Sequence, residues 1–225
     1  LACPDVQPIH LVRYLIFVGH LTEMWHGHRT QVQQTAHLAA YEKAHGVTVG
    51  LREVAAVLEA MGVPPEQTGI DQLHLYRAPF AWDGDFAWPY FVAYPTIALA
   101  GLGLGPLAGR IDGLFAATAR RGVLQALSRA QLVPPELVML LWSIALGTAK
   151  TERPYAMAAL ERLPGTPPRV LSALQDGKSD VRAAAAEWAA RLGLQEAVPV
   201  LQAALKKEKQ EIGRASCRER VSSVV

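Results

Sequence analysis

The last third of the chain contains an internal repeat, which constrains the fold more than any other feature. The stretch ERPYAMAALERLPGTPPRVLSAL aligns with DVRAAAAEWAARLGLQEAVPVLQAAL at an offset of 29 to 30 residues, which places Arg153 on Arg182 and Leu163 on Leu192. Each copy has a run of small and apolar residues, a glycine-containing turn and a second apolar run, which predicts a pair of helices. A helix pair of this length cannot cover its own apolar face, so such units stack as a solenoid.

Small side chains let the first helix of each pair lie close to its neighbours, and larger side chains fill the layer between them. Four alanines precede Trp188 in DVRAAAAEWAARLG, so we expect Trp188 in that layer. Ser179 or Asp180 is expected to cap this helix by accepting a hydrogen bond from a backbone N–H. The predicted structural core contains Leu137, Leu141, Ile144, Trp188, Leu192 and Leu201.

Helical spacing also dominates the rest of the chain. Apolar residues recur at steps of three and four in LREVAAVLEAMG and in PPELVMLLWSIALG, whose first proline is Pro134. Gly62 and Gly147 are expected to end these two helices, and Gly62 can take the left-handed conformation. No convincing alternating pattern predicts a strand, so the expected fold is all-α. Further helices are expected at about 9–24, 29–45, 111–130, 153–163, 168–175, 180–192 and 197–210.

The composition is typical of a packed protein, with 51% hydrophobic and 19% charged residues. The longest apolar stretches are too short or too rich in glycine to span a membrane. Because the chain begins at Leu1 with no signal peptide, we expect it to be a fragment of a larger protein.

The final stretch, EIGRASCRERVSSVV, resembles a reading frame derived from a vector or adapter, so residues 212–225 are expected to be non-native. Three arginines and one glutamate in this tail account for the whole net charge of +2. The remainder is therefore neutral, which removes the charge argument for nucleic-acid binding. Without the tail Cys3 is the only cysteine, which rules out an internal disulfide and indicates a reducing, cytoplasmic setting.

Five segments carry a resemblance to a known family: LREVAAVLEAMG, WPYFVAYP, LWSIALGTAKTERPYAMAALE, SDVRAAAAEWAARLG and LQAALKKEKQE. In this order they resemble large bacterial proteins of the molybdate-metabolism-regulator-like family, which combine HEAT-like helical arrays with a conserved C-terminal domain and often a WGR module. The resemblance spans about residues 9–211. It implies an irregular helical array over 1–150 and short HEAT-like repeats over 151–211. The resemblance implies a regulatory role, but it assigns no catalytic residue to this chain.

The segment HLTEMWHGH is the strongest candidate for metal binding. His20, Glu23 and His26 are spaced three apart, and Glu-x-x-His is a helical metal-binding pair in carboxylate-bridged bundles. Such sites need a second copy and further glutamates, which this sequence lacks. Steps of three also spread the ligands around the helix. The pattern therefore favours a polar helix end over a metal site.

Residues 76–94 hold eight of the sixteen aromatic residues and are expected to form a long aromatic-rich connection. The rings can either fix this connection onto the helices or form a partner-binding surface. In the second case Trp82, Phe86, Trp88 and Tyr90 are the candidate residues. Arg77 is the only basic residue nearby, so stacking on nucleic acid is poorly supported. The nearby GLGLGPLAG lacks the lysine and hydroxyl residue of a phosphate-binding loop and is expected to be a loop or helix junction.

These features favour a non-catalytic scaffold that presents a helical-repeat surface to a protein partner or to another domain of the same protein. No Ser-His-Asp or Cys-His arrangement predicts an enzyme, and no cofactor is expected. The alternative is a regulatory region that binds a small anion or metal near His20–His28.

Overall fold

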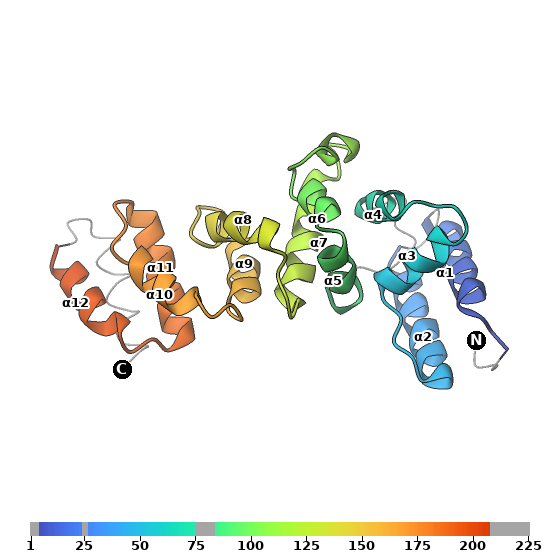
Figure 1. Ribbon diagram of the computed structural model, residues 1–225, viewed down its shortest axis with the longest axis horizontal. Coiled ribbons are helices and arrows are strands. Elements are labelled where there is room, and N and C mark those ends of the chain that lie inside the picture. Colours follow the sequence, from blue (N-terminus) through green and yellow to red (C-terminus); the bar gives the residue numbers. More distant parts are fainter. Residues whose placement is uncertain (1–4, 24–26, 75–83, 208–225) are drawn as a thin grey trace. The chain divides into compact units, whose positions relative to one another are not determined.

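The computed structural model describes residues 5–23, 27–74 and 84–207, with side chains given for 5–15, 36–74 and 84–203 (Figure 1). Every regular element in these ranges is helical, which confirms the all-α class. None of the described helices combines the length and the hydropathy that crossing a membrane requires. The elements are α1 (Pro8–Glu23), α2 (Gly27–His45), α3 (Leu51–Glu59), α4 (Pro65–Leu73), α5 (Gly84–Ala93), α6 (Pro95–Gly101), the 3-10 helix η1 (Ala108–Arg110), α7 (Ala116–Arg129), α8 (Pro135–Ala145), α9 (Arg153–Leu160), α10 (Thr166–Ala173), α11 (Ser179–Leu192) and α12 (Ala197–Lys207).

The chain divides into two compact units, 1–130 and 131–225, which are described separately. Within the second unit, α8 packs against α9. The guanidinium of Arg153, at the start of α9, donates a hydrogen bond of 2.6 Å to the carbonyl of Gly147 and so ties α9 to the end of α8.

Proline sets the start of several helices. Pro65, Pro95 and Pro135 each occupy the first turn of a helix, where a missing N–H costs little. The expectation that α8 begins at the 134–135 proline pair is confirmed, whereas α4 and α6 were not predicted. Gly62 has a φ of 88°, the left-handed conformation expected after α3.

The expected connection over 76–94 is wrong in its second half, because Gly84–Ala93 forms α5. Ala87, Tyr90 and Phe91 are buried at helical spacing, and this burial stabilises the helix although Pro89 lies inside it. Residues 76–83 of the expected connection include Trp82 and lie outside the described residues.

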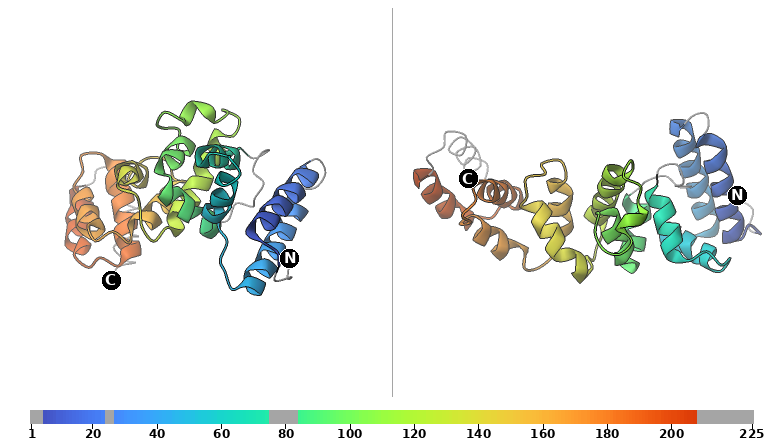
Figure 2. Two further views of the ribbon diagram at one scale, coloured as in Figure 1. Left: turned by 45° about the vertical axis from the view of Figure 1, so that its right-hand side comes forward. Right: turned by 90° about the horizontal axis from the view of Figure 1, so that it is seen from above.

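In the first unit, α1 and α2 lie side by side in Figure 1 and in both views of Figure 2. The remaining helices pack around α5, which contacts α3, α6 and α7. The largest side chains buried among α3 to α7 are Leu51, Leu73, Tyr90, Phe91, Ile97, Leu124 and Leu127.

In the second unit, α8 packs most closely against α9, and α10 against α11, which also contacts α12. Trp188 is fully buried, and its ring lies 5.0 Å from that of Trp142. Leu137, Leu141, Ile144 and Leu201 are also buried, whereas Leu192 is half-buried. The expected side-chain cap of α11 is wrong, since residue 178 is the N-cap and makes no such bond.

The burial pattern follows the predicted repeat in the first helix of each copy. At an offset of 29 residues, four buried positions of α9 coincide with four buried positions of α11. The second helices instead coincide at an offset of 31, one residue more than the sequence alignment indicates. The coinciding pairs are Ala156 and Ala185, Met157 and Ala186, Ala159 and Trp188, Leu160 and Ala189 for the first helices, and Thr166 and Ala197, Val170 and Leu201 for the second.

The aligned arginines of the two copies make the same kind of contact. Arg153 donates to the carbonyl of Gly147, six residues earlier, and Arg182 donates at 3.0 Å to that of Asp176, also six residues earlier. Each guanidinium therefore fixes the turn before its own helix. The repeat thus extends to a hydrogen bond that composition and periodicity do not reveal.

Candidate functional site

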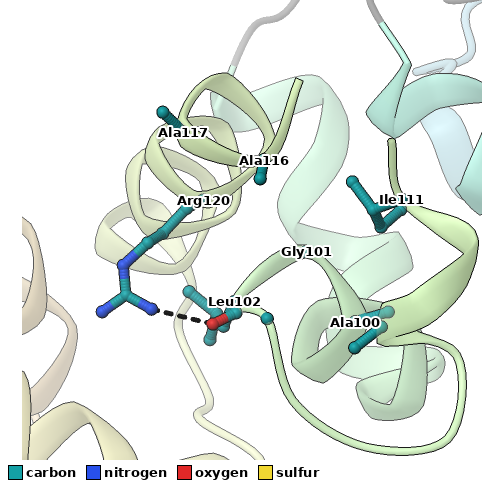
Figure 3. Close-up of a pocket in the computed structure, with 9 residues that line it drawn as sticks. Ala100, Gly101, Leu102, Ile111, Ala116, Ala117 and Arg120 are labelled. Carbon is teal, nitrogen blue, oxygen red and sulfur yellow. Dashed lines mark hydrogen bonds between the residues drawn. The ribbon is translucent and has the colours of Figure 1, made fainter. Parts of the chain in front are cut away.

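The first unit contains an apolar pocket of about 190 Å³ between the end of α6 and the start of α7 (Figure 3). Backbone and side chains of the glycine-rich segment form one wall, and the first turns of α7 form the other. The lining residues are Ala100, Gly101, Leu102, Gly103, Ala108, Ile111, Ala116, Ala117 and Arg120.

The pocket exists because its walls carry small side chains on two helices that approach closely. A Cβ on Gly101 would lie 2.6 Å from Cγ2 of Val123, so only glycine permits this spacing of α6 and α7. Gly103 has a φ of 83°, and this left-handed residue lets the chain turn away directly after α6. Ala116 and Ala117 leave open space where larger residues would fill it.

Arg120 supplies the only charged side chain among the lining residues. Its guanidinium donates a hydrogen bond of 2.8 Å to the carbonyl of Leu102, as Figure 3 shows. That carbonyl follows the last turn of α6, where carbonyl groups lack partners within the helix. The bond therefore holds a positive charge at the edge of an apolar space.

His74 fixes the segment that carries Ile111 into the pocket wall. Its Nδ1 lies 3.0 Å from the carbonyl oxygen of Ile70, and its Nε2 lies 3.1 Å from the backbone nitrogen of Asp112. A carbonyl only accepts and a backbone N–H only donates, so His74 is the neutral tautomer with its proton on Nδ1. The ring of Phe115 meets His74 edge-on at 5.9 Å.

A second polar chain ties η1 to α4. Arg110 donates to the side-chain oxygen of Gln67, whose amide donates to the carboxylate of Asp71 at 2.8 Å. Together with His74, these contacts attach the pocket-forming segment to α4 at two points. The pocket therefore has a preorganised wall.

Two large apolar side chains lie exposed on the segment that frames the pocket. Leu104 is 44% exposed and Leu114 is 76% exposed. Apart from Arg120, no lining residue bears an acid, a base or a nucleophile. The arrangement is suited to binding an apolar group and offers no general acid–base pair.

The aromatic residues proposed for partner binding separate into two environments. Tyr90 is fully buried, and its hydroxyl donates to the carbonyl of Pro65, so its ring is not available to a partner. Phe86 and Trp88 are half-buried. Burial raises the pKa of the Tyr90 phenol far above its usual value, and the negative charges of ionised Tyr94 and Glu66 add to the rise.

The candidate metal segment cannot be assessed in the same way. His26 lies outside the described residues, and His20 and Glu23 belong to α1 but their side chains lie outside the described part. Among the described residues, no group of three or more histidine, cysteine, aspartate or glutamate side chains is placed to hold a metal ion.

Comparisons with protein-family models, with curated proteins and with solved structures return no match for this chain. The geometry of the chain itself is therefore the basis for assigning a function.

Proposed function

We propose that this chain is a non-catalytic interaction module, a HEAT-like helical array that binds a protein partner or another domain of its parent protein. The observation that carries the proposal is the apolar pocket between α6 and α7, together with the exposed Leu104 and Leu114 on the segment that joins these two helices. Exposed apolar groups beside an apolar concavity are typical of surfaces that bind a partner.

The size of the pocket suits a single anchoring side chain. A cavity of about 150 Å³ admits benzene, and this pocket has about 190 Å³. A leucine, isoleucine or phenylalanine of a partner would therefore fit. The preorganised wall supports the proposal further, because a fixed concavity loses little conformational entropy when it is filled.

The test is a selection of displayed random peptides on the full chain and on two variants. Ala116→Trp fills the pocket, and Thr118→Trp adds the same ring to the same exposed turn at a residue that does not line it. Peptides that contain an aliphatic or aromatic anchor should bind the wild type and Thr118→Trp but not Ala116→Trp. The absence of any peptide with this dependence would refute the proposed function.

A further inference from the structure

The elements around the pocket are strongly cationic. Residues 101–129 contain four arginines and one aspartate, a net charge of +3, whereas the whole chain carries +2. The single acid, Asp112, accepts a hydrogen bond of 2.8 Å from the backbone N–H of Leu114. The residues outside this segment together carry a net charge of −1 (+2 for the chain less +3 for the segment), so the segment that forms the pocket is positive relative to the rest of the chain.

Three of these arginines lie in or next to the elements that form the pocket. Arg120 forms part of the pocket wall, Arg121 is the next residue on α7, and Arg110 ends η1. Arg110 and Arg121 are exposed, and Arg120 is half-buried. A partner whose apolar side chain enters the pocket would bring its neighbouring residues to the segment that carries these three guanidinium groups.

We infer that the pocket recognises an acidic segment of a partner protein, in which one aliphatic or aromatic side chain enters the pocket and flanking aspartate or glutamate residues face Arg110, Arg120 and Arg121. This inference rests on the proposed function and adds the chemistry of the partner. Guanidinium groups pair well with carboxylates, and opposite charge around an apolar anchor raises the association rate and the selectivity. A basic segment would meet like charges and would be rejected.

A single-stranded nucleic acid is the competing occupant of a cationic surface. Its phosphates would use the exposed arginines, but nucleotide binding of this kind relies on aromatic stacking platforms. The lining of the pocket contains no aromatic residue. The apolar concavity therefore favours a peptide.

The composition of the peptides selected on wild type, and not on Ala116→Trp, tests the inference. We expect aspartate and glutamate to be enriched beside the anchor and lysine and arginine to be depleted. Pocket-dependent peptides without this bias would leave the proposed function standing and overturn the inference. Failure to select any pocket-dependent peptide would refute both.

Fluorescence anisotropy with a selected peptide gives a second measure. The double variant Arg110→Gln and Arg121→Gln should bind about 5- to 20-fold more weakly at low salt, and the difference should shrink at high salt. Arg52→Gln, which removes an exposed charge from α3, should leave the affinity unchanged. Equal affinity of the double variant and the wild type at low salt would overturn the inference. So would an oligouridine probe that binds through the same arginines and is unaffected by Ala116→Trp.

Discussion

Replacing Trp188 by alanine is the most direct test of the packing in the second unit. The Trp188 side chain is fully buried on α11. Its ring is tilted by 42° to that of Trp142 at a centroid distance of 5.0 Å. Its Nε1 donates a hydrogen bond of 3.3 Å to the carboxylate of Glu161. The alanine variant removes all of these contacts at once and leaves a space that only side chains from other helices can fill.

The expected loss follows from these contacts. Truncation of a buried tryptophan to alanine costs about 3–5 kcal/mol. An aromatic pair at this separation contributes about 0.5–1.5 kcal/mol beyond its buried area. The bond to Glu161 adds little, because it is long and because that carboxylate keeps its ion pair with Arg191. We therefore expect Trp188→Ala to lower the free energy of unfolding by about 4–5 kcal/mol, the upper half of the truncation range.

Urea unfolding of the full chain, followed by far-UV circular dichroism, measures this loss. Trp188→Phe is the matched control, because it keeps an aromatic ring beside Trp142 and loses only the larger ring system and the N–H. It should cost about 1–2 kcal/mol. A loss below about 1 kcal/mol for Trp188→Ala would refute the reasoning, because no fully buried tryptophan in a close-packed layer can be removed so cheaply.

Three further predictions concern polar groups. Because the pKa of Tyr90 is raised in the folded state, its contribution to stability is complete below pH about 10 and is lost as the pH rises further. Tyr90→Phe should therefore flatten the decline in unfolding free energy over that alkaline range. An unchanged decline would contradict the raised pKa of Tyr90. His74→Leu removes the acceptor for the backbone N–H of Asp112 and should speed amide hydrogen exchange at Asp112, at a cost of about 1 kcal/mol. In urea unfolding, Arg153→Ala should lower the free energy of unfolding by about 2–3 kcal/mol and Arg182→Ala by about 1 kcal/mol, because Arg153 is buried and Arg182 is half-buried. If Arg182→Ala proves the more costly of the two, burial does not set the strength of these contacts.

Much of the helical structure is readable from the sequence, and the errors have identifiable causes. The proline pairs at 64–65 and 134–135 are the same signal, since each precedes a helix that begins at its second proline. The first pair also follows a completed helix, a position in which proline equally fits a helix stop, so this signal alone does not predict α4. The sequence predicts a helix from residue 111, but α7 begins at Ala116, because Asp112 accepts the backbone N–H of Leu114 and forms a turn there.

The aromatic-rich segment shows where local rules fail. Pro89 and the density of large rings argue against a helix, yet Ala87, Tyr90 and Phe91 have the spacing of a buried helical face. Burial of three side chains outweighs one missing backbone hydrogen bond. The spacing is visible in the sequence. Whether burial of this face outweighs the hydrogen bond lost at Pro89 depends on the helices that pack against it, which the spacing does not show.

The pocket could not be predicted, because it results from residues that are far apart in sequence. Gly101 and Val123 must meet across α6 and α7, and His74 must reach Asp112. Neither pair follows from periodicity. The glycine-rich composition of 101–109 is the available signal, and it indicates a loop or helix junction without indicating an apolar pocket.

The repeat illustrates what a helix pair preserves and what it allows to vary. Ala159 and Trp188 occupy equivalent positions and are 1% and 0% exposed, although their volumes differ by an indole ring. Arg153 and Arg182 differ in burial, yet both donate to the carbonyl six residues earlier. Periodicity specifies which positions face the core, whereas the side chain that fills each position depends on the neighbouring helix. The size of a core residue can therefore differ between the two copies while the arginine hydrogen bond to the turn before the helix is kept. That bond joins residues only six apart, so it does not depend on the neighbouring helix.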